Sequence, residues 1–116
     1  MTPQTTHDLL RYLLHRITID ARTGCWTWTR ACSQSGWRAV WYPVVRVGRT
    51  LYRVNRLTLL LHQAQAHPPQ EGESPVAWVA RVNALYAGQE ASHTCDHSRC
   101  VNPHHLTWLS FFFRIR

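Results

Sequence analysis

Residues 92–108 read SHTCDHSRCVNPHHLTW, and this stretch decides how the rest of the chain is interpreted. A lone histidine, His93, precedes a C-x4-C-x4-H pattern formed by Cys95, Cys100 and His105. Thiolates and an imidazole at such short spacings are the usual ligands of a tetrahedral zinc ion. The segment therefore predicts a structural zinc site with one neighbouring histidine left over for proton chemistry.

The fourth zinc ligand has two candidates upstream of this segment. Cys25 stands in TGCWTW, residues 23–28, and Cys32 follows a few positions later. Cys25 is the first candidate and Cys32 is then a free thiol; in the alternative, Cys32 is the ligand and Cys25 is a small core residue. A disulfide framework would give no reason for His105, so the spacing favours a metal over disulfides.

The length of 116 residues suits a single domain, 1–116, with a modest core that a metal site would supplement. We place the motif core at 92–108 and a helix-rich insertion at about 67–90. There is no apolar stretch of transmembrane length and no signal peptide at the start of the sequence. We therefore expect an intracellular protein with reduced cysteines, without a choice among cytoplasm, nucleus and organelle.

The charge balance points to nucleic acid as the partner. Thirteen basic residues, all of them arginine, oppose six acidic residues and give a formal net charge of +7. Arginine suits bidentate contacts to phosphate and stacking on bases, although a GC-rich coding sequence would produce the same preference for arginine over lysine. We expect a nucleic acid, DNA or RNA, as the partner, and no membrane.

Local patterns predict an α+β chain. Apolar spacing predicts helices over 6–16, with Thr6 as the N-cap, and over 54–66. A third helix over 75–87 should follow the cap Ser74. Residues 17–52 predict two or three antiparallel strands with a hairpin around Gly48. A short strand at 92–94 should lead through the metal loop to a final helix that begins near His104 after Asn102 and Pro103.

The segment SHTCDHSRCVNPHHLTW resembles the His-Cys box of homing endonucleases, a branch of the HNH (ββα-metal, His-Me finger) nuclease superfamily. TGCWTW at 23–28 and NRLTLLLH at 55–62 are similar in order and position to segments of related HNH proteins, so the resemblance spans about 17–109. It implies a small zinc-stabilised ββα-metal domain with an upstream antiparallel sheet and flanking helices.

The resemblance also implies a function, a metal-dependent endonuclease that hydrolyses DNA phosphodiester bonds, and assigns roles to residues. His93 would be the general base that deprotonates the attacking water. The structural Zn²⁺ would be held by Cys25, Cys95, Cys100 and His105. An active enzyme would use a catalytic Mg²⁺ in addition. The arginines expected to contact nucleic acid are Arg56, Arg99 and Arg114.

The sequence departs from the family pattern at the cation ligand. The family places an asparagine nine positions beyond the last zinc histidine, and this chain has Arg114 there, which cannot ligate Mg²⁺. The alternative function is therefore an inactive, nuclease-derived nucleic-acid-binding protein, for example in a ribonucleoprotein, with Phe111–Phe113 as a surface for a protein partner. A zinc-finger regulator fits less well, because no recognition-helix pattern follows the loop.

Overall fold

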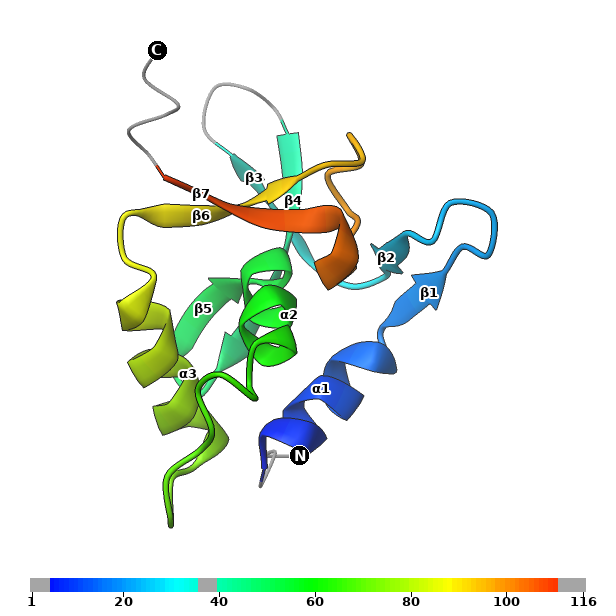
Figure 1. Ribbon diagram of the computed structural model, residues 1–116. Coiled ribbons are helices and arrows are strands. Elements are labelled where there is room, and N and C mark those ends of the chain that lie inside the picture. The colour runs from blue at the N-terminus through cyan, green and yellow to red at the C-terminus, as the bar shows by residue number, and fades with distance from the viewer. Residues whose placement is uncertain (1–4, 36–39, 111–116) are drawn as a thin grey trace.

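The computed structural model describes residues 5–35 and 40–110, and this part of the chain contains three α-helices. They are α1 (Thr6–Leu14), α2 (Val54–His62) and α3 (Pro75–Leu85), which confirms the three helices predicted upstream of the motif (Figure 1). Each helix ends earlier than predicted, and the N-cap of α1 is Thr5, whose hydroxyl accepts from the Asp8 N–H. No helix in the described part is long and apolar enough to cross a membrane.

Seven strands form three small antiparallel sheets in the described residues. The sheets have the orders β1-β2, β3-β4-β5 and β6-β7. Five of the strands lie between residues 17 and 53, where two or three were expected. The strands are β1 (Ile17–Ile19), β2 (Trp26–Trp28), β3 (Cys32–Ser35), β4 (Val40–Val47), β5 (Thr50–Arg53), β6 (Gln89–His93) and β7 (Leu106–Ser110).

The predicted hairpin at Gly48 is confirmed. Val47 pairs with Thr50, which leaves a two-residue turn that begins with Gly48 at φ +64°. A Cβ at this position would also lie 2.9 Å from Cγ1 of Val76 in the first turn of α3. Glycine is required here because its backbone adopts the left-handed conformation and because the turn packs directly on α3.

Helix α2 is the centre of the molecule. It contacts the other two helices, the β4-β5 hairpin and both strands of the β6-β7 hairpin (Figure 1). Seven of its nine residues are buried, so the helix is enclosed on nearly every side. The buried core around it consists of Leu9, Leu13, Trp28, Val47, Val54, Leu57, Leu60, Leu61, Trp78, Val79, Val82 and Val101.

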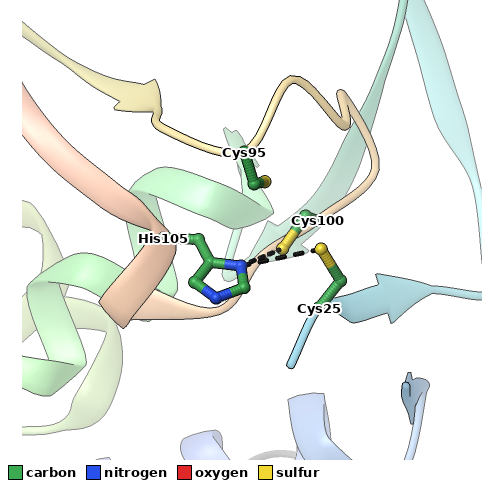
Figure 2. A group of neighbouring side chains, drawn as sticks. All are labelled: Cys25, Cys95, Cys100 and His105. Atoms are coloured by element: carbon green, nitrogen blue, oxygen red, sulfur yellow. Dashed lines mark hydrogen bonds between the residues drawn. The ribbon is translucent and has the colours of Figure 1, made fainter. Parts of the chain in front are cut away.

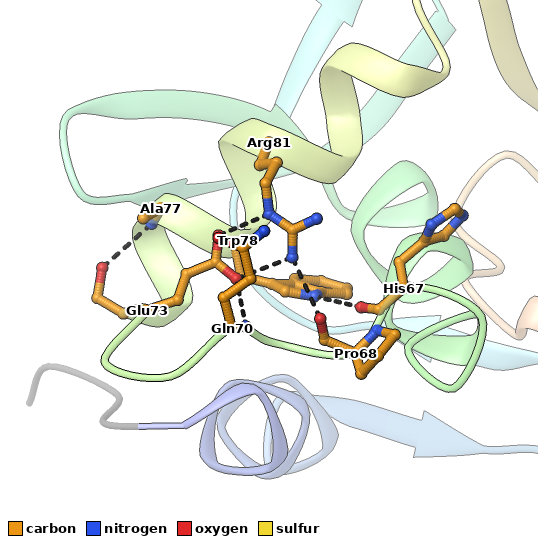
Figure 3. Close-up of polar contacts among 8 residues, drawn as sticks. His67, Pro68, Gln70, Glu73, Ala77, Trp78 and Arg81 are labelled. Atoms are coloured by element: carbon orange, nitrogen blue, oxygen red, sulfur yellow. Dashed lines mark hydrogen bonds and ion pairs between the residues drawn. The ribbon is translucent and has the colours of Figure 1, made fainter.

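The loop between α2 and α3 is fastened to α3 by polar contacts (Figure 3). The indole N–H of the buried Trp78 donates to the carbonyl of His67 at 2.7 Å. Arg81 forms an ion pair with Glu73 at 2.7 Å. The guanidinium of Arg81 and the backbone N–H of Gln70 lower the pKa of Glu73 to about 2. These contacts fix the residues that precede the cap of α3.

The predicted final helix is wrong. Asn102 does act as a cap, since its side chain accepts from the His104 N–H at 2.9 Å, but only a 3-10 turn follows, Pro103–His105. The chain then enters β7, which pairs with β6 from His93↔Leu106 to Gln89↔Ser110. Residues 106–110, LTWLS, combine β-forming side chains with a ready partner strand, and this pairing outweighs the cap signal. The expected Phe111–Phe113 surface lies outside the described residues.

Candidate metal centre

Three thiols and one imidazole converge at one point of the structure (Figure 2). The ligand atoms of Cys25, Cys95, Cys100 and His105 all lie within 4.8 Å of one another. Nδ1 of His105 is 3.5 Å from Sγ of Cys100 and 3.6 Å from Sγ of Cys25. In a tetrahedral zinc site, bond lengths of roughly 2.0 to 2.3 Å place neighbouring ligand atoms about 3.5 to 3.8 Å apart. The cluster could therefore hold a metal ion such as zinc.

Backbone pairing brings the distant Cys25 to the loop that carries the other ligands. Thr27 of β2 forms an isolated bridge with Cys100. The N–H of Trp28 donates to the Arg99 carbonyl at 3.1 Å, and the N–H of Val101 donates to the Trp26 carbonyl at 2.8 Å. Because Cys25 directly precedes β2, this short antiparallel contact sets its thiol beside that of Cys100.

Asn102 ties the same two segments together from the side. It is buried, and its Nδ2 donates to the Gly24 carbonyl at 2.6 Å. Gly24 has φ +76°, and a Cβ there would lie 3.4 Å from Nε2 of His105. The sequence alone predicts only a capping role for Asn102. Its second role depends on a contact between residues 24 and 102, which no local pattern signals.

The thiol of Cys100 is hard to ionise without a cation. Burial raises the pKa of Cys100 to about 12. Contacts with the thiols of Cys25 and Cys95 act in the same direction as burial, against the backbone hydrogen bond from Asn102. A bound divalent ion reverses this balance because it coordinates the thiolate form. The chemistry of the donor set thus fits zinc better than it fits three free thiols.

Cys32 is not part of the cluster. It lies in β3, where its thiol is 3.8 Å from the carbonyl oxygen of Arg30. The structure therefore places Cys25, the first candidate for the fourth ligand, in the cluster and leaves Cys32 as a free thiol.

His93 lies beside the cluster without belonging to it. It is the last residue of β6, and its Nε2 is 2.8 Å from the carbonyl oxygen of Cys100. A carbonyl only accepts, so Nε2 must carry the proton, and Nδ1 of the neutral ring carries the lone pair. Burial lowers the pKa of His93 and His97 lowers it further, although the hydrogen bond to Cys100 opposes both. The ring is thus favoured in its neutral form.

The three arginines expected to contact nucleic acid have different outcomes. Arg56 is half-buried, and its guanidinium donates to the Asn83 side chain and to the carbonyls of Asn83, Tyr86 and Gln89. It also lies over the ring of Trp108 at 4.8 Å. Four of its five N–H groups serve the fold, so Arg56 is a structural residue.

Arg99 is exposed in the loop between Cys95 and Cys100 and remains a candidate contact. Arg114 lies outside the described residues. In the described part, the Cys25–Cys95–Cys100–His105 cluster is the only group of three or more His, Cys, Asp or Glu side chains placed to hold a metal ion. The described residues therefore do not provide a magnesium site built from three such side chains.

Comparisons with known proteins give one distant relative. Protein 2.8 of Escherichia phage T7 is 25% identical over 100 residues, a region that covers 86% of this chain and 52% of that protein. This chain therefore matches about half the length of the phage protein. No protein-family model and no solved structure matches the chain significantly.

Proposed function

We propose that this chain is a zinc-stabilised endonuclease of the HNH, His-Cys box type that hydrolyses phosphodiester bonds of DNA. The observation that carries the proposal is the hydrogen bond from His93 to the carbonyl of Cys100 at 2.8 Å. It joins the candidate base to the backbone of a candidate metal ligand. The β6-β7 hairpin, with the metal loop between its strands, supports the same class.

The geometry of His93 suits a general base. The donated proton on Nε2 leaves Nδ1 as the acceptor, and the lowered pKa keeps the ring neutral near pH 7. A water hydrogen-bonded to Nδ1 would lose its proton to the ring as its oxygen attacks phosphorus. The bond from phosphorus to the leaving sugar oxygen would break, and that oxygen would take a proton from solvent water. The exposed Arg99, in the loop that follows His93, would supply a contact to the phosphate.

The metal would act on structure rather than on the reacting atoms. Cys25, Cys95, Cys100 and His105 would bind zinc, which supplies a rigid tether between the start of β2 and the loop after β6. Cys100 links this tether to His93, because its thiol is a ligand and its carbonyl accepts from the imidazole. Loss of the metal should therefore disturb the orientation of the base as well as the fold.

The test is a nicking assay with supercoiled plasmid and Mg²⁺ or Mn²⁺, using wild type and His93→Ala. We expect wild type to produce open circles and His93→Ala to be roughly 100- to 10,000-fold slower. His7→Ala is the matched control, since His7 is an exposed histidine of α1. Zinc content and unfolding temperature are measured for all three proteins.

Equal cleavage by wild type and His93→Ala would remove His93 from the mechanism. Absence of cleavage with either cation, together with tight binding of the plasmid, would favour the alternative of a nucleic-acid-binding protein that does not hydrolyse its partner.

A further inference from the structure

A groove of about 370 Å³ lies between α1, the β2-β3 connection and the β4-β5 hairpin. It is separate from the four residues of the metal centre. Its wall includes three arginines from three parts of the sequence, Arg16, Arg30 and Arg46. Tyr12 and Leu51 also line it. None of these residues belongs to the motif at 92–108, so the sequence pattern alone did not single them out.

Arg16 is held in place before any ligand arrives. Its guanidinium carbon lies 3.5 Å from the centroid of the Tyr12 ring, and one terminal nitrogen donates to the Tyr12 carbonyl at 2.7 Å. The side chain thus loses little further freedom when its remaining N–H groups bind an anion.

The charge of the groove is not balanced by the protein. No acidic side chain lines it in the described part of the chain. Within the described residues, no ion pair joins Arg16, Arg30 or Arg46 to a carboxylate. Three like charges around one groove favour an anionic occupant.

The positive surface continues beyond the groove along the hairpin. In the β4-β5 register Arg46 is opposite Leu51, and Arg53 is opposite Val44, which also lines the groove. Residues directly opposite each other share a face of the sheet. Arg53 lies over the ring of Tyr42, 4.2 Å from its centroid. Three arginines around the groove and a fourth on the same face of the hairpin suit a repeating anion better than a single small one.

We infer that this groove binds the phosphodiester backbone of a nucleic-acid strand, and so anchors the substrate at a second place on the protein. The inference rests on the proposed function, because it takes nucleic acid as the partner. Guanidinium groups supply the phosphate contacts, and the exposed side chain of Leu51 offers an apolar contact for a sugar or base.

The test compares two double variants of equal net charge in the His93→Ala background, where cleavage cannot consume the probe. Arg30→Gln/Arg46→Gln removes two groove arginines. Arg11→Gln/Arg22→Gln removes two exposed arginines outside the groove. Binding of a fluorescent DNA duplex and of a single-stranded RNA is followed by anisotropy between 50 and 200 mM salt, with zinc content as the check on folding.

We expect Arg30→Gln/Arg46→Gln to weaken binding at least about tenfold more than Arg11→Gln/Arg22→Gln does. The groove variant should also reduce the slope of log affinity against log salt by about 2. The probe with the larger loss identifies the nucleic acid that the groove holds. Equal losses in the two double variants, or no loss in either, would overturn the groove assignment. Groove-dependent binding without any cleavage by the wild-type protein would instead overturn the endonuclease and leave the groove standing.

Discussion

Cys100 serves the candidate site twice, because its thiol belongs to the metal cluster and its carbonyl oxygen accepts the hydrogen bond from His93. The contact with the carbonyl oxygen fixes the proton of the neutral His93 ring on Nε2. A change at the metal should reach His93 through a single residue.

The lowered pKa of His93 gives a prediction at the residue scale. An NMR titration of the zinc-loaded protein should place the midpoint of this histidine below 6.5, because burial disfavours the imidazolium. Since the unfolded chain binds the proton first, His93 makes folding less favourable as pH falls below 6.5. A midpoint at or above 6.5 would contradict the buried neutral ring.

Gly24 provides a second residue-scale prediction, with Gly72 as its control. Both glycines have a positive φ, +76° and +74°, but only Gly24 lies against the metal cluster, at His105. Alanine at either position should destabilise the protein by about 1 to 2 kcal/mol through backbone strain. Only Gly24→Ala should also weaken zinc binding, measured by competition with a chromophoric chelator. Equal zinc affinities in the two variants would show that the Gly24 turn does not position the ligands.

At the scale of the helices and strands, the sequence predicted correctly those features that depend on a few neighbouring residues. Ser74 caps α3 as predicted, and Gly48 turns the β4-β5 hairpin as predicted. Asn102 and Pro103 also began a helical turn, but the signal at the start of a helix does not set its length. The turn stays short because β6 offers residues 106–110 a full set of pairing partners. That competition lies in tertiary structure and is not visible in the cap.

The caps Ser74 and Asn102 can be compared directly, because Ser74 caps a helix away from the metal centre and Asn102 caps the turn that carries His105. Asn102→Ala removes a buried donor to the Gly24 carbonyl and the cap on His104, so it should cost about 2 to 3 kcal/mol and weaken zinc binding. Ser74→Ala removes an exposed cap and should cost about 1 kcal/mol. Zinc affinity should not change in Ser74→Ala. Denaturant unfolding and chelator competition measure both effects, and an Asn102→Ala protein with normal zinc affinity would exclude the tether.

At the scale of the whole molecule, long-range contacts bring the residues of the candidate site together. The metal cluster joins position 25 to the segment from 95 to 105. Spacing within the motif identified three of its members, and Cys25 was the first candidate for the fourth. The pairing of β2 with residues 99–101 is the physical reason that Cys25, and not Cys32, lies at the cluster.

Arginine composition likewise predicted a charged surface but not its location. Arg56 is half-buried and bound to Asn83 and neighbouring carbonyls, because α2, α3 and β6 meet around it. The groove arginines come together only when α1 meets the β4-β5 hairpin. Neither outcome has a signature in local sequence.

X-ray absorption at the zinc edge of the purified protein would show whether Cys25, Cys95, Cys100 and His105 hold one zinc ion. We expect one zinc per chain, with three sulfur ligands at about 2.3 Å and one nitrogen at about 2.0 to 2.1 Å. The spectrum should be unchanged in Cys32→Ser and should lose a sulfur in Cys25→Ser. A protein purified without zinc, or zinc bound by oxygen and nitrogen alone, would show that these four residues do not form the metal site.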